Sequence, residues 1–406
     1  MASTASGSKP AQPAAPLNLA MISRFKPAKI YQQSTEPVLA ESKPPNAPPG
    51  ARPPPASPRH ANHITGITFD DHGDTLVTAG EDETFRLYNC KTGKHMKTLY
   101  SKKYGVDLPR FTHKNTTIVY ASTKEDDTIR YHSLHDNKYL QYFKGHKKKV
   151  VSLEVCPTDD GFMSGSEDNT VRLWDLRSPT CRGILNTPST PVVTYDCTGL
   201  IFAVGLNAYQ RILLYDTKNY DKEPFLTIHL DDNSLKRESY PPRVPVMTSL
   251  SFSTNGRWLL VGTAGNGHYI LDSFEGGLLA KLEGFEGLER GKTGEKVGVV
   301  PVRGISGEEV SWTPDSKYVV GGSYNGKVHF WDIGAAEPLA PTREGQDPKK
   351  VLPAFSLDGH PGPSRCVKFN PRFAMICSAG QELVSSVIEM CVFLGEASDL
   401  VLSLSR

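Results

Sequence analysis

Two short runs of lysine are the residues of this sequence best suited to bind a ligand. Lys102 and Lys103 stand together, and a second run follows at Lys147, Lys148 and Lys149. From residue 91 to residue 150 there are 14 Lys and Arg against 5 Asp and Glu, a local excess of 9. A phosphate carries up to about two negative charges near pH 7 and pairs well with clustered Lys and Arg. We therefore treat these lysines as a candidate phosphopeptide site, the alternative being a solvated rim that keeps the protein soluble.

A glycine-rich run has the composition of a nucleotide-binding loop but not its spacing. In Gly287-Leu288-Glu289-Arg290-Gly291-Lys292-Thr293 only three residues separate the glycines, whereas the P-loop motif needs four. No buried strand precedes the run and no helical pattern follows it, so we interpret it as an exposed insertion. Glu308-Glu309 likewise has no histidine or serine arrangement around it that would make a catalytic site. The sequence predicts no catalytic, cofactor-binding or metal-binding residue.

The elements that position these residues are short strands in a repeated pattern. Residues 164–175 read Ser-Gly-Ser-Glu-Asp-Asn-Thr-Val-Arg-Leu-Trp-Asp, in which Glu167 to Asn169 supply turn chemistry and Thr170 to Trp174 form a strand. The pattern returns at residues 80–89, 125–131, 211–216, 268–272 and 325–332. Each copy is therefore one hairpin of a repeat, and another strand with its own turn lies upstream of most copies.

The spacing of the copies identifies the repeat. The first three intervals between closing positions are 44, 42 and 41 residues, taken between Asn89, Ser133, Asp175 and Asp216. These intervals are close to the ~40–45 residues of a four-stranded WD-repeat blade, and two longer later intervals suggest blades with loop insertions. The apolar strands show little alternation, as expected where each blade packs both faces on its neighbours. We predict an all-β fold, a seven-bladed WD-repeat β-propeller.

Four residues of the best copy resemble the hydrogen-bonded set of a WD-repeat blade. They are His146 of Gly145-His146, Ser164, Asp168 and Trp174. We interpret them as the structural set that ties loop to strand, and not as chemical groups. His360 of Gly359-His360 is interpreted in the same way.

The ends of the chain depart from the repeat. We predict a disordered tail over 1–21, a strand over 22–36 that closes the last blade, a Pro-rich insert over 37–60, the propeller over 61–383 and an atypical C-terminal tail over 384–406. The sixth blade is expected to end near residue 339, before a Pro- and charge-rich connector over 338–353. Residues 384–394 replace the expected Phe-Trp ending, so the last blade should be irregular there or use a substitute strand.

Bulk properties exclude several classes of protein. The formal net charge of the 406 residues is only +2, which gives no general reason to expect nucleic-acid binding. The seven cysteines are scattered and include no Cys-x-x-Cys pair, which favours free thiols in a reducing compartment over disulfides or a zinc site. No run of ~18 apolar residues exists, so no membrane span is expected.

Several runs resemble one particular WD-repeat family more closely than the repeat in general. These runs are residues 98–108, 126–140, 173–179, 199–203 and 369–373, and the match covers most of residues 22 to 382. On them the chain is similar to the WD-repeat subunit shared by the COMPASS histone-lysine methyltransferase complex and the cleavage/polyadenylation machinery with its associated phosphatase.

The resemblance implies an adaptor without catalysis or cofactor that resides in the nucleus. It implies protein partners: methyltransferase-complex subunits, cleavage/polyadenylation-factor subunits and the phosphorylated tail of RNA polymerase II, to which the family links these machineries in transcription termination. It implies neither sequence-specific nucleic-acid binding nor membrane attachment. The alternative is an unrelated propeller adaptor, for instance the substrate receptor of a ubiquitin ligase, because a fold alone does not fix function.

Overall fold

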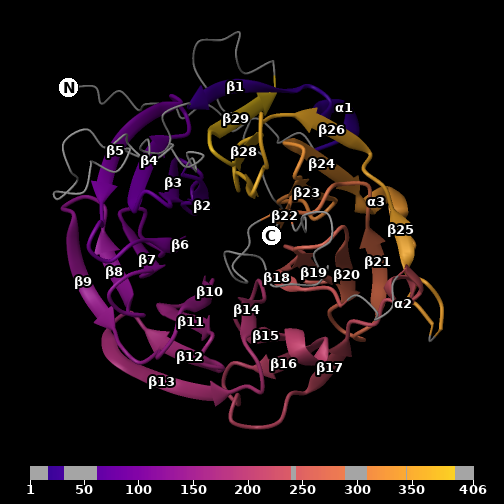
Figure 1. Ribbon diagram of the computed structural model, residues 1–406, viewed down its shortest axis with the longest axis horizontal. Helices are drawn as coiled ribbons and strands as arrows, with labels where there is room; N and C mark the ends of the chain where they lie inside the picture. The colour runs from indigo at the N-terminus through magenta and orange to yellow at the C-terminus, as the bar shows by residue number, and fades with distance from the viewer. Residues whose placement is uncertain (1–16, 32–61, 239–243, 289–308, 344, 389–406) are drawn as a thin grey trace, which may run out of the picture.

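The computed structural model of the chain is a ring of seven antiparallel sheets, so the predicted seven-bladed propeller is confirmed (Figure 1). It describes residues 17–31, 62–238, 244–288, 309–343 and 345–388. The blades follow one another around the ring in chain order, with the first strand of each blade innermost.

The first five blades each contribute four consecutive strands. Blades one to three are built from β2 (Ile64–Phe69), β3 (Thr75–Gly80), β4 (Thr84–Asn89) and β5 (Lys94–Tyr100), then β6 (Asp107–Phe111), β7 (Thr117–Ala121), β8 (Ile129–Ser133) and β9 (Lys138–Phe143), then β10 (Val150–Val155), β11 (Gly161–Ser166), β12 (Thr170–Asp175) and β13 (Ser178–Asn186). Blades four and five are built from β14 (Pro191–Tyr195), β15 (Ile201–Leu206), β16 (Arg211–Asp216) and β17 (Leu226–His229), then β18 (Met247–Phe252), β19 (Trp258–Thr263), β20 (His268–Asp272) and β21 (Leu278–Leu282).

The last two blades and the short helices complete the ring. Blade six contains β22 (Val310–Trp312), β23 (Tyr318–Gly322), β24 (Lys327–Asp332) and β26 (Phe355–Asp358), and blade seven contains β27 (Cys366–Phe369), β28 (Met375–Ala379), β29 (Leu383–Ile388) and β1 (Phe25–Tyr31). The remaining elements are α1 (Leu19–Ile22), the 3-10 turn η1 (Asn207–Tyr209), α2 (Asn233–Glu238), α3 (Ile333–Ala336) and β25 (Lys349–Val351).

The core lies between the blades and not at the centre of the ring. Within the described residues, seven buried apolar clusters lie between neighbouring blades, and together they account for all seven blade interfaces. Six of them draw side chains from two blades, and the cluster between blades four and five also includes Val151 of blade three. Strands such as β7 and β11 are buried along their whole length, because both of their faces are covered. This double burial explains the near-continuous apolar runs in the sequence.

Blade seven is closed by the N-terminal strand. β1 pairs antiparallel with β29 from Phe25 opposite Ile388 to Tyr31 opposite Leu383. The predicted C-terminal tail begins at residue 384, but Val384 and Val387 continue a regular strand, because backbone pairing on both sides does not require the missing Phe-Trp ending. The predicted N-terminal tail extends to residue 21, whereas the structure places Leu17 and α1 against blades six and seven, where Leu17 is buried.

Blade six does not end where the sequence suggested. The chain leaves β24, adds β25 in parallel to the outer edge of β21 in blade five, and only then returns as β26, the outer strand of blade six. The expected boundary near residue 339 was therefore wrong. The error arises because the Pro-rich connector gives no strand signal in the sequence. It contains β25, which pairs with blade five, and is followed by β26, which pairs with blade six.

Some sequence interpretations fall outside the described residues. These are residues 1–16 of the tail, the Pro-rich insert over 37–60, most of the glycine-rich run over 287–293 and the chain end over 389–406. The six cysteines in the described part of the chain are free, and no helix there is both long and apolar enough to cross a bilayer. In the same residues, no group of three or more His, Cys, Asp and Glu is placed to hold a metal ion.

Candidate functional site

Both lysine runs lie in loops that connect consecutive blades. Lys102 and Lys103 follow β5, and residues 147–149 precede β10. Because strand direction alternates through each antiparallel blade, the loops between blades and the turns between second and third strands share one end of the propeller. Two neighbouring loops at one end of blades one to three therefore carry all five predicted lysines.

The first loop is held on blade two by an aromatic and a buried arginine. The centroid of the Tyr104 ring lies 3.7 Å from Arg130 Cζ and 5.1 Å from Lys103 Nζ. The Arg130 side chain is only 2% exposed and pairs with Asp126 at 2.9 Å. A desolvated cation over an aromatic face contributes about 2 kcal/mol. The stack thus fixes the turn that presents Lys102 and Lys103, both of which are exposed.

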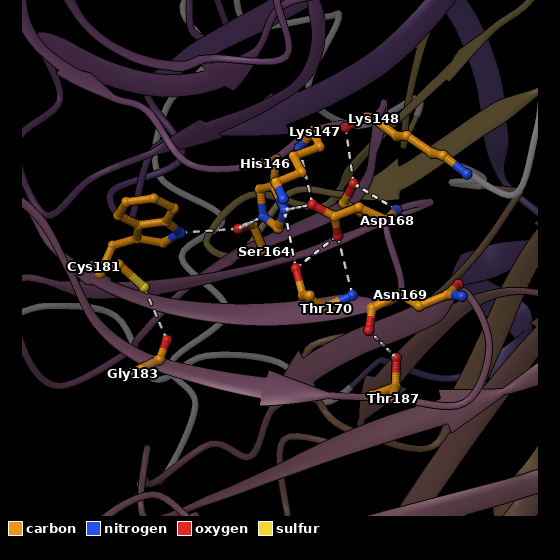
Figure 2. Close-up of polar contacts among 12 residues, drawn as sticks. His146, Lys147, Lys148, Ser164, Asp168, Asn169, Thr170, Cys181, Gly183 and Thr187 are labelled. Carbon is orange, nitrogen blue, oxygen red and sulfur yellow. Dashed lines mark hydrogen bonds and ion pairs between the residues drawn. The ribbon is translucent and has the colours of Figure 1, made fainter.

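The second loop begins at a chain of four side chains (Figure 2). Trp174 Nε1 donates to Ser164 Oγ at 2.9 Å, Ser164 Oγ contacts His146 Nε2 at 2.7 Å, and His146 Nδ1 contacts Asp168 Oδ2 at 3.0 Å. One assignment of protons satisfies every member: Ser164 donates to His146 Nε2, and His146 Nδ1–H donates to Asp168. The four residues come from the loop, β11, the hairpin turn and β12.

Electrostatics favour this assignment. Burial lowers the pKa of His146, so its imidazole is neutral at pH 7. Burial alone would raise the pKa of Asp168, but hydrogen bonds from Thr170, the Lys147 amide and His146 outweigh it and lower the pKa to about 2. The side chains of His146 and Asp168 are 1% and 8% exposed, so no substrate reaches them. The geometry is consistent with the structural role predicted for this set.

The exposed end of the second loop carries the lysines. The Lys147 amide donates to Asp168 Oδ2 at 3.0 Å, so the hydrogen-bonded chain also fixes the backbone of the loop. The side chains of Lys147 and Lys148 are exposed, whereas Lys149 lies 3.7 Å from Asp107 and is one-third exposed. Of the five predicted lysines, the structure therefore leaves Lys149 the least accessible to a ligand.

Acidic residues lie among these lysines. Asp127 is near Asp126, Asp168 and Glu167, and burial together with these negative charges raises its pKa. Lys124 of the same end pairs with Glu83. The surface that carries the predicted lysines is therefore mixed in charge and is not a uniform basic field.

Sequence reasoning missed the aromatic part of this site. Tyr139 and Tyr142 of β9 extend the stack, with Tyr139 5.9 Å from Tyr104 and 5.6 Å from Tyr142. No spacing signal links Tyr104 to Arg130, because the contact depends on how an inter-blade loop folds over the next blade. Glu309 was discarded as a catalytic candidate, and it is a buried acceptor from Thr248 Oγ1 at 3.0 Å; Glu308 lies outside the described residues.

Comparison with known proteins agrees with this architecture. Residues 56–89, 137–175 and 301–332 match the family model described as WD domain, G-beta repeat, so the chain is a WD-repeat β-propeller. It is 38% identical to WD repeat-containing protein 82 of Drosophila melanogaster over 88% of this chain and 93% of that protein. It is 36% identical to Set1 complex component swd2 of Schizosaccharomyces pombe, over 78% and 90%, and 32% identical to COMPASS component SWD2 of Saccharomyces cerevisiae, over 78% and 88%. The chain belongs to the WD-repeat family that these three proteins represent.

Proposed function

We propose that this chain is a non-catalytic adaptor subunit of a nuclear, COMPASS-like histone-lysine methyltransferase complex. The observation that carries the proposal is family membership: relatives named as Set1 complex and COMPASS components align over 78% of this chain. The structure supports a binding role, because its histidine, serine and acid side chains at the candidate site are engaged in holding turns.

The proposal includes a second set of partners. We infer that the same propeller serves the mRNA cleavage/polyadenylation and termination machinery and links both assemblies to the phosphorylated tail of RNA polymerase II. Lys102, Lys103, Lys147 and Lys148, exposed in adjacent loops, are the groups that would pair with phosphate.

Affinity purification of the tagged full chain from its own cells tests the assignment to complexes. We expect histone-methyltransferase subunits and cleavage/polyadenylation-factor subunits to co-elute in stoichiometric amounts. Recovery of ubiquitin-ligase components without either set would replace the proposal by the substrate-receptor alternative.

Charge reversal tests the phosphopeptide site. The double variant Lys147→Glu/Lys148→Glu should weaken binding to a phosphorylated polymerase-tail peptide by about tenfold or more, since charge-assisted hydrogen bonds contribute ~1.5–3 kcal/mol each. The matched control is Lys218→Glu/Lys222→Glu, which changes two exposed lysines at the opposite end of blade four. Equal affinity of wild type and the first variant at moderate salt would eliminate this site.

A further inference from the structure

The outer strands of blades one and two differ from those of the other blades. Met96 and Tyr100 on β5 are each 55% exposed, and Leu140 and Tyr142 on β9 are 48% and 42% exposed. Among the outer strands, β13 and β1 carry one such large exposed apolar residue each, and β17 and β26 carry none. Apolar side chains gathered at neighbouring outer edges indicate a surface that another molecule covers.

The two outer strands are neighbours on the circumference. Lys97 of β5 donates to the carbonyls of Leu134 and His135, at 3.3 and 3.0 Å, in the turn that leads into β9. Figure 1 shows β5 and β9 in succession along the outside of the ring. We call the surface formed by Met96, Tyr100, Leu140 and Tyr142 with the adjacent lysines the outer basic surface.

In blade five the residue at the corresponding position is buried. Each of the outer strands β5, β9 and β21 contains a β-bulge, and the extra residue is Met96, Leu140 and Leu279, respectively. Leu279 is 2% exposed and lies in the apolar cluster between blades five and six, which also contains Val351 of β25. The bulge residue is therefore covered in blade five but open in blades one and two.

Blade five also carries an added strand at its outer edge, with a charge opposite to that of the residue it faces. β25 pairs in parallel with β21, and the Glu283 amide donates to Val351 O at 3.0 Å. Lys350 of this segment pairs with Glu283, which follows β21, at 2.9 Å. The propeller itself thus shows that the outer edge of a blade accepts one more strand, held by backbone hydrogen bonds and opposite charges.

The outer basic surface presents lysines, whereas the edge of blade five presents Glu283 to Lys350 of the added strand. Lys94, Lys138 and Lys144 on or beside β5 and β9 are exposed. The strand that fits this edge therefore carries Asp or Glu where β25 carries lysine.

We propose that the outer basic surface binds an extended acidic segment of a partner protein, whose apolar side chains cover Leu140 and Met96. The segment adds to the edge of blade two as β25 adds to blade five, and its carboxylates pair with Lys138 and Lys144. The inference rests on the proposed adaptor function, for which it supplies a docking mode distinct from the phosphopeptide loops.

The test uses the purified full chain and a labelled twelve-residue peptide of alternating Glu and Val, with fluorescence anisotropy as the readout. We expect binding that is weakened about tenfold by Leu140→Glu and similarly by Lys138→Glu/Lys144→Glu, and amide-exchange protection in β9. Ile184→Glu on β13 is the matched control, because Ile184 is 49% exposed on the outer strand of the next blade. An alternating Lys-Val peptide should not bind.

Three outcomes would overturn the proposal. If a twelve-residue poly-Glu peptide bound as tightly as the alternating Glu-Val peptide, binding would depend on non-specific charge attraction alone. An equal effect of Ile184→Glu would show that the edge of blade two is not special. Tighter binding of a twelve-nucleotide single-stranded RNA that displaces the peptide would assign the surface to nucleic acid. Because no complex subunit is present in this assay, its failure leaves the co-purification result unaffected.

Discussion

Blade three differs from blades one and two in the partner that it provides for the aspartate of the hairpin turn. Each places an aspartate in the turn between its second and third strands. In blade three Asp168 contacts the neutral ring of His146 at 3.0 Å, whereas in blade one Asp82 pairs with Arg86 at 2.8 Å and in blade two Asp126 pairs with Arg130. In each turn an aspartate acts as the acceptor, whereas the donor is a histidine in blade three and an arginine in blades one and two.

The two solutions differ in charge and in reach. The histidine of blade three comes from the preceding loop, so the contact also fixes that loop. The arginines lie four residues after their acids on the same hairpin, so in blade two the loop is held instead by Tyr104 stacked on Arg130. The arginine equivalent in blade three, Arg172, forms no ion pair with Asp168 within the described residues, and its Nε has no partner there. In blade three, His146 therefore takes the place of both the arginine that pairs with the turn aspartate and the tyrosine that holds the loop in blade two.

The largest expected effect is at the buried ion pair of blade one. The side chains of Asp82 and Arg86 are 1% and 8% exposed, so Asp82→Ala leaves a buried cation without its partner. We expect this variant to lower the free energy of unfolding by about 3–5 kcal/mol, measured by urea denaturation.

Asp126→Ala is the matched control for that change. Its carboxylate is 40% exposed, and water can therefore replace it beside Arg130. We expect a clearly smaller loss than at Asp82. Equal losses at the two positions would mean that burial does not set the energy of these pairs and would remove the distinction drawn between blades one and two.

The difference between blades also shows what sequence can and cannot predict. The blade three set was predicted from its resemblance to the hydrogen-bonded set of a WD-repeat blade. The ring follows from the spacing of the repeats, and the N-terminal strand from its aromatic and β-branched residues. The stack of Tyr104 on Arg130 was not predicted, because this contact between a loop and a strand depends on the geometry of the loop alone. The pairing of β25 with β21 joins segments about seventy residues apart in different blades, and no local pattern encodes such a contact.

Blade seven has a third arrangement, in which the histidine lacks an acid partner within the described part of the chain. From it we predict how the stability of the protein depends on pH. His360 Nε2 contacts Ser378 Oγ at 2.8 Å, as His146 contacts Ser164, but no acid accepts from Nδ1 in the described residues. Burial lowers the pKa of His360 to about 4, below the ~6.5 of an unfolded chain. The unfolded state therefore binds the proton first, and the stabilisation present above pH 6.5 is lost as the pH falls toward 4.

This pKa difference corresponds to a loss of about 2 kcal/mol between pH 7 and pH 5. His360→Asn keeps a hydrogen-bonding group beside Ser378 and removes the titration. Urea denaturation at the two pH values should therefore give a shallower pH dependence for the variant than for wild type. Parallel curves would show that other groups, such as the fully buried His268, account for the acid sensitivity.

A smaller effect is expected from breaking the first contact of the blade three chain. Trp174→Phe keeps most of the ring, which packs against Phe143 and Phe162, but removes the Nε1 donor to Ser164. One hydrogen bond contributes about 1 kcal/mol, and we expect a loss of that size in urea denaturation. The matched variant is Trp331→Phe in blade six. It removes a single Nε1 donor, which bonds to the backbone carbonyl of Glu283. A loss several times larger at Trp174 alone would show that the four-residue chain is cooperative.

The smallest effect concerns the residue after the turn aspartate. Glu83 in blade one has φ +65° and Asn169 in blade three has φ +61°, both in the left-handed region. Asn tolerates this conformation, whereas a long side chain such as Glu is strained by roughly 1 kcal/mol. Glu83→Gly relieves the strain and loses an exposed ion pair with Lys124 that contributes at most ~0.5 kcal/mol. We expect Glu83→Gly to stabilise the protein by about 0.5 kcal/mol and Asn169→Gly to change little. If the two variants gained equally, backbone strain could not distinguish the turns, and the difference between blades would lie in the partners of Asp82 and Asp168 alone.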